Sequence, residues 1–274
     1  MPVRTTDLPP VLDGVVLVLD RPRDVTNVGG VVRAMGNFGL TRLRLVEPAA
    51  YDPERVLAMA HRGAPVLARL ERHATFDAAL ADCGFVLGTT ARPRAVRHER
   101  MAPRQAAPAL LSAASRDPAT PAAVLFGPED RGLSNAALGR CNAVVTIPTA
   151  PDDPSLNLAQ SVLVIAYELW LAATTGASLA HMPDAAAALS TAPTTEPLAQ
   201  GTAREEMFAA LEDVLWGMHP NNDAGRVTHT LARLRAVLLR AAPRAEEVQM
   251  LTRLFVHIAH ERRRQDGAGT RGSG

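Results

Sequence analysis

The chain has 274 residues, of which 47% are hydrophobic and 21% are charged. This composition supports a sizeable core and excludes wholesale disorder. The formal net charge of +1 neither demands nor excludes a polyanionic partner, because a local basic patch can exist within a neutral total.

Cysteine usage and apolar runs narrow the class of protein. Cys83 and Cys141 form no CxxC motif and have no nearby histidine pair, so we expect neither a metal site nor a disulfide framework. The N-terminus lacks the layout of a signal peptide. The longest apolar run, Leu158 to Thr174, contains Gln160 and Glu168 and predicts a buried helix rather than a membrane span. We therefore expect a cytoplasmic protein.

The first part of the chain alternates short β-rich runs with helical stretches. The runs predict buried strands at residues 15–20, 43–46, 85–90, 122–127 and 143–148. Helices are predicted between them at about 27–38, 53–62, 76–83, 104–115 and 134–141, and a last one from near Ser155 to about Thr174. This alternation predicts an α/β domain over residues 1–176, with a parallel sheet covered by helices on both faces.

The second part of the chain differs in composition. Residues 177–203 are rich in Ala, Thr and Pro without amphipathic spacing, and we interpret them as a linker. A small helical extension is predicted over 204–264, from amphipathic stretches near 204–217, 224–241 and 244–263, before a flexible tail at 265–274. Two interpretations of the extension stay open: a module with a solvated outer face, or one that contacts RNA or a partner.

A first motif follows the first predicted strand. Asn27 opens a strand-to-helix turn that contains Gly29, Gly30 and Arg33. Free N–H groups at the helix start could hold phosphate, the glycines would permit close approach of a ligand, and an arginine can fork onto a phosphate. The alternative is that the glycines only pack the helix on the sheet. The dinucleotide fingerprint GxGxxG is absent, which argues against a dehydrogenase.

A second motif ends the fourth predicted strand. It contains Gly127, Glu129, Gly132 and Leu133, at the strand edge where ligands of open α/β sheets bind. Ser134 is placed to cap the next helix. The alternative interpretation is an ordinary capped connection between a strand and a helix.

A third motif surrounds the start of the long apolar helix. Ile147 and Pro148 lead into a loop that ends at Ser155, Leu156 and Asn157. Ser155 could cap this helix. Asn157 is predicted to lie inside the first turn of an apolar helix, and a buried amide needs partners from a loop or a ligand.

Together, in this order and at these separations, the three motifs resemble the SPOUT/SpoU class of RNA ribose 2′-O-methyltransferases. The family pattern reads N-x-G-x-x-x-R with a following F-G, then F-G-x-E-x-x-G-L, then I-P and S-L-N-x-A with a later Y-E. More narrowly the chain resembles the TrmJ group, which methylates nucleotide 32 of the tRNA anticodon loop. The residues for this are Gly88 to Arg94 and the run from His219 to Leu251, where the usual H-P-G is replaced by His219-Pro-Asn-Asn.

The resemblance implies a fold, a cofactor and an assembly. The fold would be a sheet with a C-terminal trefoil knot, which is exceptional among proteins, and the enzyme would be a homodimer without metal. The cofactor would be S-adenosyl-L-methionine, bound by Thr89, Thr90, Ala91, Gly127, Glu129, Gly132, Leu133, Ile147, Pro148, Ser155 and Leu156.

The resemblance also assigns catalytic residues: Asn27, Arg33, Ser155 and Asn157. Our hypothesis is that Arg33 clamps a phosphate and polarises the 2′-hydroxyl, because an arginine side chain stays protonated in proteins. Arg33, Arg92, Arg94 and Arg97 would contact RNA; the alternative for the last three is a solvated loop. Two other functions are kept open: a related methyltransferase acting on rRNA or another tRNA position, and a non-catalytic RNA-binding member of the fold.

Overall fold

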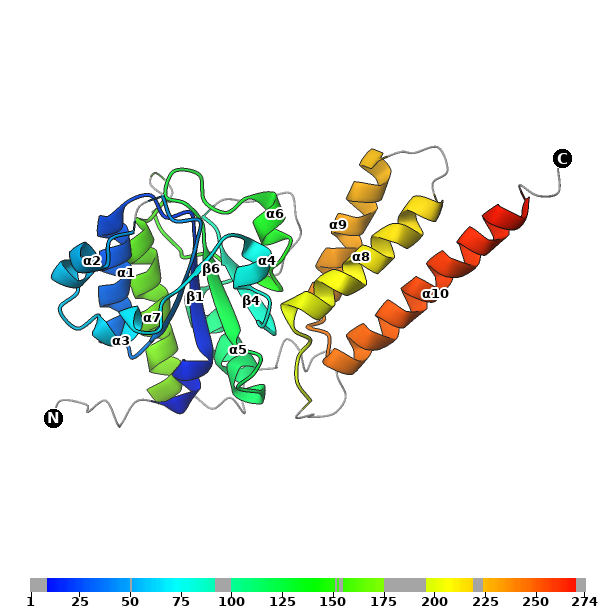
Figure 1. Cartoon of the computed structure of the whole chain (residues 1–274). Coiled ribbons are helices and arrows are strands. Elements are labelled where there is room, and N and C mark those ends of the chain that lie inside the picture. Colours follow the sequence, from blue (N-terminus) through cyan, green and yellow to red (C-terminus); the bar gives the residue numbers. More distant parts are fainter. Residues whose placement is uncertain are drawn as a thin grey trace.

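The computed structural model describes residues 9–49, 51–91, 100–150, 152, 155–174, 196–218 and 224–269, with side chains up to residue 264. An α/β domain stands beside an array of three long helices, and the C-terminal helix projects away from the sheet (Figure 1). No helix in these ranges is long and apolar enough to cross a membrane.

The α/β domain is built on a seven-stranded parallel sheet. Its strands are ordered β3-β2-β1-β6-β4-β7-β5 and span Val15–Asp20 (β1), Arg42–Val46 (β2), Glu71–His73 (β3), Phe85–Thr89 (β4), Arg100–Met101 (β5), Ala122–Phe126 (β6) and Ala143–Val145 (β7). The five strands predicted from apolar runs are confirmed, and the sheet is parallel throughout as predicted. The two edge strands were not predicted, because β3 has no apolar residue and β5 has only two residues.

Helices cover both faces of the sheet. One face packs against α1 (Val25–Asn37), α2 (Pro53–Met59), α3 (Ala64–Leu67), α5 (Pro103–Arg116) and α7 (Leu158–Thr174), and the other against α4 (Phe76–Ala79) and α6 (Asn135–Leu138). A short 3₁₀ helix, Pro10–Gly14, precedes β1. In β1, Val15, Leu17 and Leu19 point into the first core and Val16 and Val18 into the second. This period of two is what a strand buried on both faces requires.

The three predicted C-terminal helices are present, as α8 (Gly201–Met218), α9 (Ala224–Arg240) and α10 (Ala245–Gly269). α8 packs on both α9 and α10, around a third hydrophobic core. Most of the predicted linker lies outside the described residues. Its last residues are ordered, because Leu198 bridges to Arg244 and α8 already begins at Gly201.

Buried polar side chains join the extension to the sheet. The Arg204 guanidinium on α8 is 3% exposed and donates to the backbone oxygens of Gly84 (2.8 Å) and Cys83 (2.9 Å), just before β4. Asn142 accepts from the Val86 N–H and donates to the Leu239 oxygen at the end of α9 (2.7 Å). These bonds tie two helices of the extension to the start of β4.

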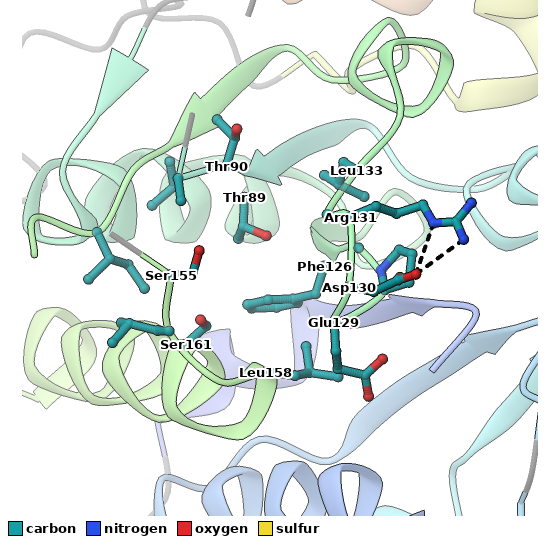
Figure 2. Close-up of a pocket in the computed structure, with 17 residues that line it drawn as sticks. Thr89, Thr90, Phe126, Glu129, Asp130, Arg131, Leu133, Ser155, Leu158 and Ser161 are labelled. Atoms are coloured by element: carbon teal, nitrogen blue, oxygen red, sulfur yellow. Dashed lines mark hydrogen bonds and ion pairs between the residues drawn. The ribbon is translucent and has the colours of Figure 1, made fainter. Parts of the chain in front are cut away.

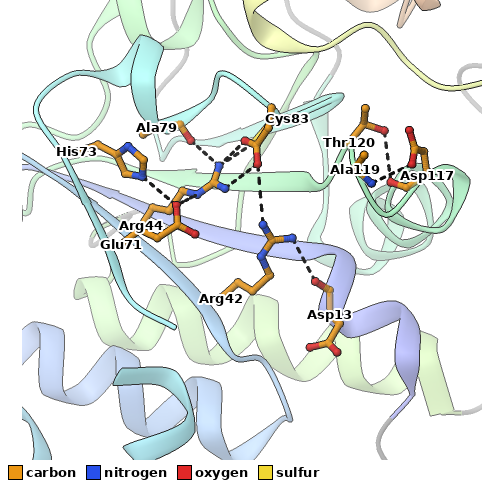
Figure 3. Close-up of polar contacts among 11 residues, drawn as sticks. Asp13, Arg42, Arg44, Glu71, His73, Ala79, Cys83, Asp117, Ala119 and Thr120 are labelled. Atoms are coloured by element: carbon orange, nitrogen blue, oxygen red, sulfur yellow. Dashed lines mark hydrogen bonds and ion pairs between the residues drawn. The ribbon is translucent and has the colours of Figure 1, made fainter. Parts of the chain in front are cut away.

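A second buried arginine lies within the sheet. Arg44 of β2 donates to both carboxylate oxygens of Asp82 (2.6 and 2.8 Å), to Glu71 and to the Ala79 oxygen (Figure 3). Burial opposes ionisation of Asp82, but the hydrogen bonds and charge of Arg44 prevail and lower the pKa of this carboxyl. The network anchors the outer strands β2 and β3 to the segment that follows α4.

Candidate functional site

A pocket opens where β4, β6 and β7 end. Figure 2 shows Thr89 and Thr90 on one side, the loop from Glu129 to Leu133 on another, and Ser155, Leu158 and Ser161 from the start of α7. The C-terminal edge of a parallel sheet is where α/β proteins bind ligands. The second and third sequence motifs therefore meet at this pocket, whereas no residue of the first motif lines it.

Two glycines shape the loop between β6 and α6. Gly132 has φ of +67°, in the left-handed region that favours glycine. A Cβ at Gly127 would lie 2.2 Å from the Leu133 nitrogen, so only glycine allows the chain to fold back this closely. Ser134 then accepts from the Ala137 N–H and caps α6, as predicted. The loop is a tight turn that presents its backbone to the pocket.

A chain of hydrogen bonds links the three motifs at the pocket rim. The Ala159 N–H donates to Asn157 Oδ1, and Asn157 Nδ2 donates to Asn27 Oδ1, both at 2.8 Å. Asn27 Nδ2 in turn donates to Glu129 Oε1 at 2.8 Å, while Glu129 Oε2 accepts from the Arg23 N–H at 3.3 Å. Each amide has one orientation that satisfies its neighbours, so the chain fixes α1, the pocket loop and the start of α7 relative to one another.

An ion pair supports the same loop from outside. Arg23, after β1, pairs with Asp130 at 2.9 Å, and Arg131 hydrogen-bonds to the same carboxylate. The hydrogen bond from Arg131, followed by the charges of Arg131 and Arg23, lowers the pKa of Asp130. The loop thus carries two carboxylates, Glu129 and Asp130, at the rim of the pocket.

The predicted cofactor residues gather at this pocket with one exception. All of them except Pro148 line it. The pocket also has lining residues that the sequence did not single out: Phe126, Pro128, Asp130, Arg131, Val145, Leu158 and Ser161. Most of these adjoin predicted residues. Ser161 had a signal in the sequence, since it lies one helical turn after Asn157 and therefore on the same side of α7.

The glycines of the first motif pack helices and do not open a path for a ligand. A Cβ at Gly29 would lie 2.6 Å from the Met59 methyl of α2, and one at Gly30 would lie 2.8 Å from Ala159 Cβ of α7. α1 also begins earlier than predicted, and the Asp24 carboxylate accepts from the Thr26 N–H at its start. An acidic cap disfavours phosphate there, and the contacts of Gly29 and Gly30 fit the alternative interpretation, in which the glycines pack the helix.

The third motif also differs in detail from its prediction. α7 begins at Leu158, so Asn157 precedes the helix and caps it. Asn157 is exposed, and the expectation of a buried amide was wrong, because the apolar helix starts after it. Ser155 does not cap α7; it lies exposed in the preceding segment and lines the pocket.

The predicted RNA-binding arginines are placed only in part. Arg33 lies exposed on α1 and is outside the lining of the pocket. Within the described residues it forms no ion pair. Arg92, Arg94 and Arg97 fall outside the residues that the structure describes.

Comparison with known proteins assigns the family. The model of the SpoU rRNA methylase family matches residues 14–167. The tRNA (cytidine/uridine-2′-O-)-methyltransferases TrmJ of Salmonella typhimurium and Escherichia coli are 32% and 33% identical to the chain. Each match covers 92% of it and 98% or 97% of the relative. The crystal structure of TrmJ from Z. mobilis ZM4 superposes with a TM-score of 0.71 at 28% identity, over 89% of this chain and 98% of that one. The chain belongs to the SpoU rRNA methylase family.

Proposed function

We propose that this protein transfers the methyl group of S-adenosyl-L-methionine to a ribose 2′-oxygen of tRNA, at nucleotide 32 of the anticodon loop. The observation that carries the proposal is one pocket lined by the second and third motifs, to which Asn27 of the first motif is joined through the Glu129–Asn27–Asn157 hydrogen bonds. Relatives named as tRNA (cytidine/uridine-2′-O-)-methyltransferases match nearly the whole chain, including the extension.

The chemistry of the pocket fits this cofactor. Leu133, Ile147 and Leu158 provide apolar walls for a base, while the close-packed turn at Gly127 presents backbone groups. Carboxylates at the rim suit a ligand that carries positive charge on its sulfur and amino group. When bound, the cofactor supplies an activated methyl group whose departure leaves a neutral thioether, so the reaction needs no metal to stabilise the leaving group.

The remaining tasks fall to side chains of this protein. They must align the ribose and promote loss of a proton from a weakly acidic hydroxyl. In our proposal Arg33 binds the phosphate beside the target ribose and polarises the 2′-hydroxyl, and phosphate or water accepts the proton. Ser155 lines the pocket where the ribose would meet the cofactor. Asn157 would position the ribose indirectly, because its amide is bonded to Asn27 and to the helix start.

The position of Arg33 supports a homodimer. Its side chain is outside the pocket of its own chain, so we propose that a second copy completes the catalytic site. α7 exposes Leu163 (43%) and Tyr167 (46%), and the Tyr167 ring meets Phe38 of α1 edge to face. Large apolar side chains on neighbouring helices are suited to bury against another copy.

The order of strands supports a knotted chain. β7 is the last strand in the sequence, yet it lies between β4 and β5, which both precede it. Ile147, Ser155 and Leu156 follow β7 and line the pocket. We propose that this end of the domain threads through the preceding loops as the family resemblance implies.

The test is methyl transfer mapped to single nucleotides. Purified protein is incubated with radiolabelled S-adenosyl-L-methionine and unmodified tRNA transcripts, with the Arg33→Ala variant as the inactive control. Methylation confined to the ribose of nucleotide 32 supports the whole proposal. Methylation at another tRNA position, or of rRNA only, rejects the position or the substrate while the reaction stands. Absence of transfer to either RNA, with the cofactor still bound, rejects the enzyme assignment.

A further inference from the structure

Helix α9 differs in charge from the other helices of the extension. Its seventeen residues include four arginines and one histidine and no acidic residue. The adjacent α8 carries one arginine against four acidic residues: Glu205, Glu206, Glu212 and Asp213. The near-neutral total of the chain therefore conceals a separation of charge between two neighbouring helices.

The basic side chains of α9 gather on its outer side. Val227 and Leu239 are buried in the core of the extension, and Leu231 and Leu238 pack against it. The opposite side carries four exposed basic residues, spaced as one strip along the helix: Arg226, His229, Arg233 and Arg240. We call these residues the α9 strip. Its length from first to last residue is about 21 Å, at 1.5 Å per residue.

Two residues of the strip, Arg233 and Arg240, are not needed to hold α9 in place. Arg235, on the inner side, holds α9 against α8. It hydrogen-bonds to both oxygens of Glu205 and lies over the Phe208 ring at 4.1 Å. Arg233 and Arg240, by contrast, form no ion pair within the described part of the chain. Exposed guanidinium groups that make no contribution to the fold remain free to bind an external anion.

Two sets of contacts fix α9 relative to the pocket. Arg140 follows α6, the helix that begins directly after the pocket loop, and it pairs with Glu205 (3.5 Å), which is bonded to Arg235 of α9. At the other end of α9 the Leu239 oxygen accepts from Asn142. Helix α9 is therefore held at a set distance from the pocket, beside the α/β domain (Figure 1).

We propose that the α9 strip binds backbone phosphates of the RNA substrate, as a second contact surface outside the catalytic pocket. This inference rests on the proposed function, which makes a polyanion the substrate. An anionic membrane surface fits less well, because α9 exposes only two large apolar side chains, Leu234 and Val237. The acidic outer side of α8, with Glu206 and Glu212 exposed, repels phosphate and directs RNA toward α9.

The test compares two variants with the same change of charge. R233E/R240E reverses two residues of the strip, whereas R253E/R264E reverses two exposed arginines on α10, which packs on a different side of α8. The probe is an unmodified tRNA transcript, with Kd measured by filter binding at several salt concentrations. Circular dichroism melts and S-adenosyl-L-methionine affinity check that both variants fold and keep the pocket.

We expect R233E/R240E to raise the tRNA Kd at least about tenfold and to lower the slope of log Kd against log salt by about 1.4 to 1.8, as for two lost phosphate contacts. R253E/R264E should keep the wild-type slope. Equal weakening by both variants, or an unchanged Kd for R233E/R240E, overturns the strip while methyl transfer by the wild type upholds the proposed function. If the strip instead binds an acidic protein, R233E/R240E would leave the tRNA Kd unchanged. Absence of methyl transfer by the wild type rejects the proposed function. The comparison of tRNA Kd values then tests RNA binding by the strip separately.

Discussion

The pocket rim and the junction between sheet and extension use similar polar residues in different surroundings. At the junction, Arg204 and Asn142 are both about 3% exposed, and their side chains bond to backbone groups. At the rim, Glu129 and Asn157 are exposed, and the side chains bond mainly to one another. Both sets connect segments that are far apart in the sequence.

The surroundings decide what each set contributes. A buried polar group that loses its partner leaves an unsatisfied atom without access to water, so the junction contributes to stability. At the rim, water replaces any lost partner at small cost, so those bonds contribute little to stability and mainly set the positions of groups around the pocket. Variants at the rim should therefore alter turnover, and variants at the junction should alter unfolding.

The largest effect is expected at Arg33. Arg33→Lys keeps the charge but loses the planar fork that grips a phosphate and polarises the hydroxyl. We expect turnover to fall by at least about 100-fold, measured as single-turnover methyl transfer to tRNA. Cofactor affinity and the urea midpoint should match the wild type, and Arg253→Lys on α10 provides a control with full activity. Retained turnover in Arg33→Lys would reject the proposed role.

The junction should show the largest loss of stability. Burial lowers the pKa of the Arg204 guanidinium, and two backbone oxygens depend on it. Arg204→Met keeps much of the volume but leaves both oxygens unpaired, which should cost about 2–5 kcal/mol in the free energy of unfolding. Urea unfolding measures this, with the exposed Arg253→Met expected to change it by less than about 0.5 kcal/mol. A loss below about 1 kcal/mol for Arg204→Met would remove the contrast between the two regions.

The fold also shows which structural elements could be predicted from the sequence and which could not. Apolar runs located the inner strands and the long helices, because burial on a sheet or a helix face leaves a period in the sequence. The edge strand Glu71–His73 leaves no such period. Arg204 was missed because arginine is treated as an exposed residue. Its spacing before Met207, Phe208 and Leu211 places it on the apolar face of α8, and this signal could have found it.

The sequence predicted which residues lie at the pocket, but not how they are arranged there. All predicted cofactor residues except Pro148 line the pocket, because the ends of parallel strands meet at one edge, but seven further lining residues were not singled out. The roles of Gly29, Gly30 and Asn157 were harder to predict from the sequence. Gly29 and Gly30 serve helix packing, which in sequence looks the same as access for a ligand. Asn157 was expected to be buried because sequence patterns do not fix the first residue of a helix.

A smaller effect on turnover is expected at Glu129. Its carboxylate accepts from Asn27 and from the Arg23 N–H. Glu129→Gln keeps an acceptor for Asn27 and places an amide donor near the Arg23 N–H, so the geometry weakens without collapsing. We expect turnover to fall less than about tenfold, with a higher KM for the cofactor and an unchanged pH profile. A fall of about 100-fold or more, with loss of the acidic limb of that profile, would identify Glu129 as the proton acceptor. Glu129→Ala, which breaks the chain, should be the more severe variant.

The smallest effect is expected at Asp82, which pairs with the buried Arg44 of the sheet. Because the pKa of Asp82 is lowered on folding, its ionised form stabilises the native state. This stabilisation is complete above the carboxyl's unfolded pKa of about 3.9, and it is lost as the pH falls through the lower folded value. Asp82→Asn should therefore cost about 1 kcal/mol at pH 7, a value discounted because this side chain is 38% exposed. The difference from the wild type should shrink in urea unfolding at acid pH. An equal difference at pH 7 and pH 3 would mean that Arg44 is held by its bonds to Ala79 and Glu71 and not by the charge of Asp82.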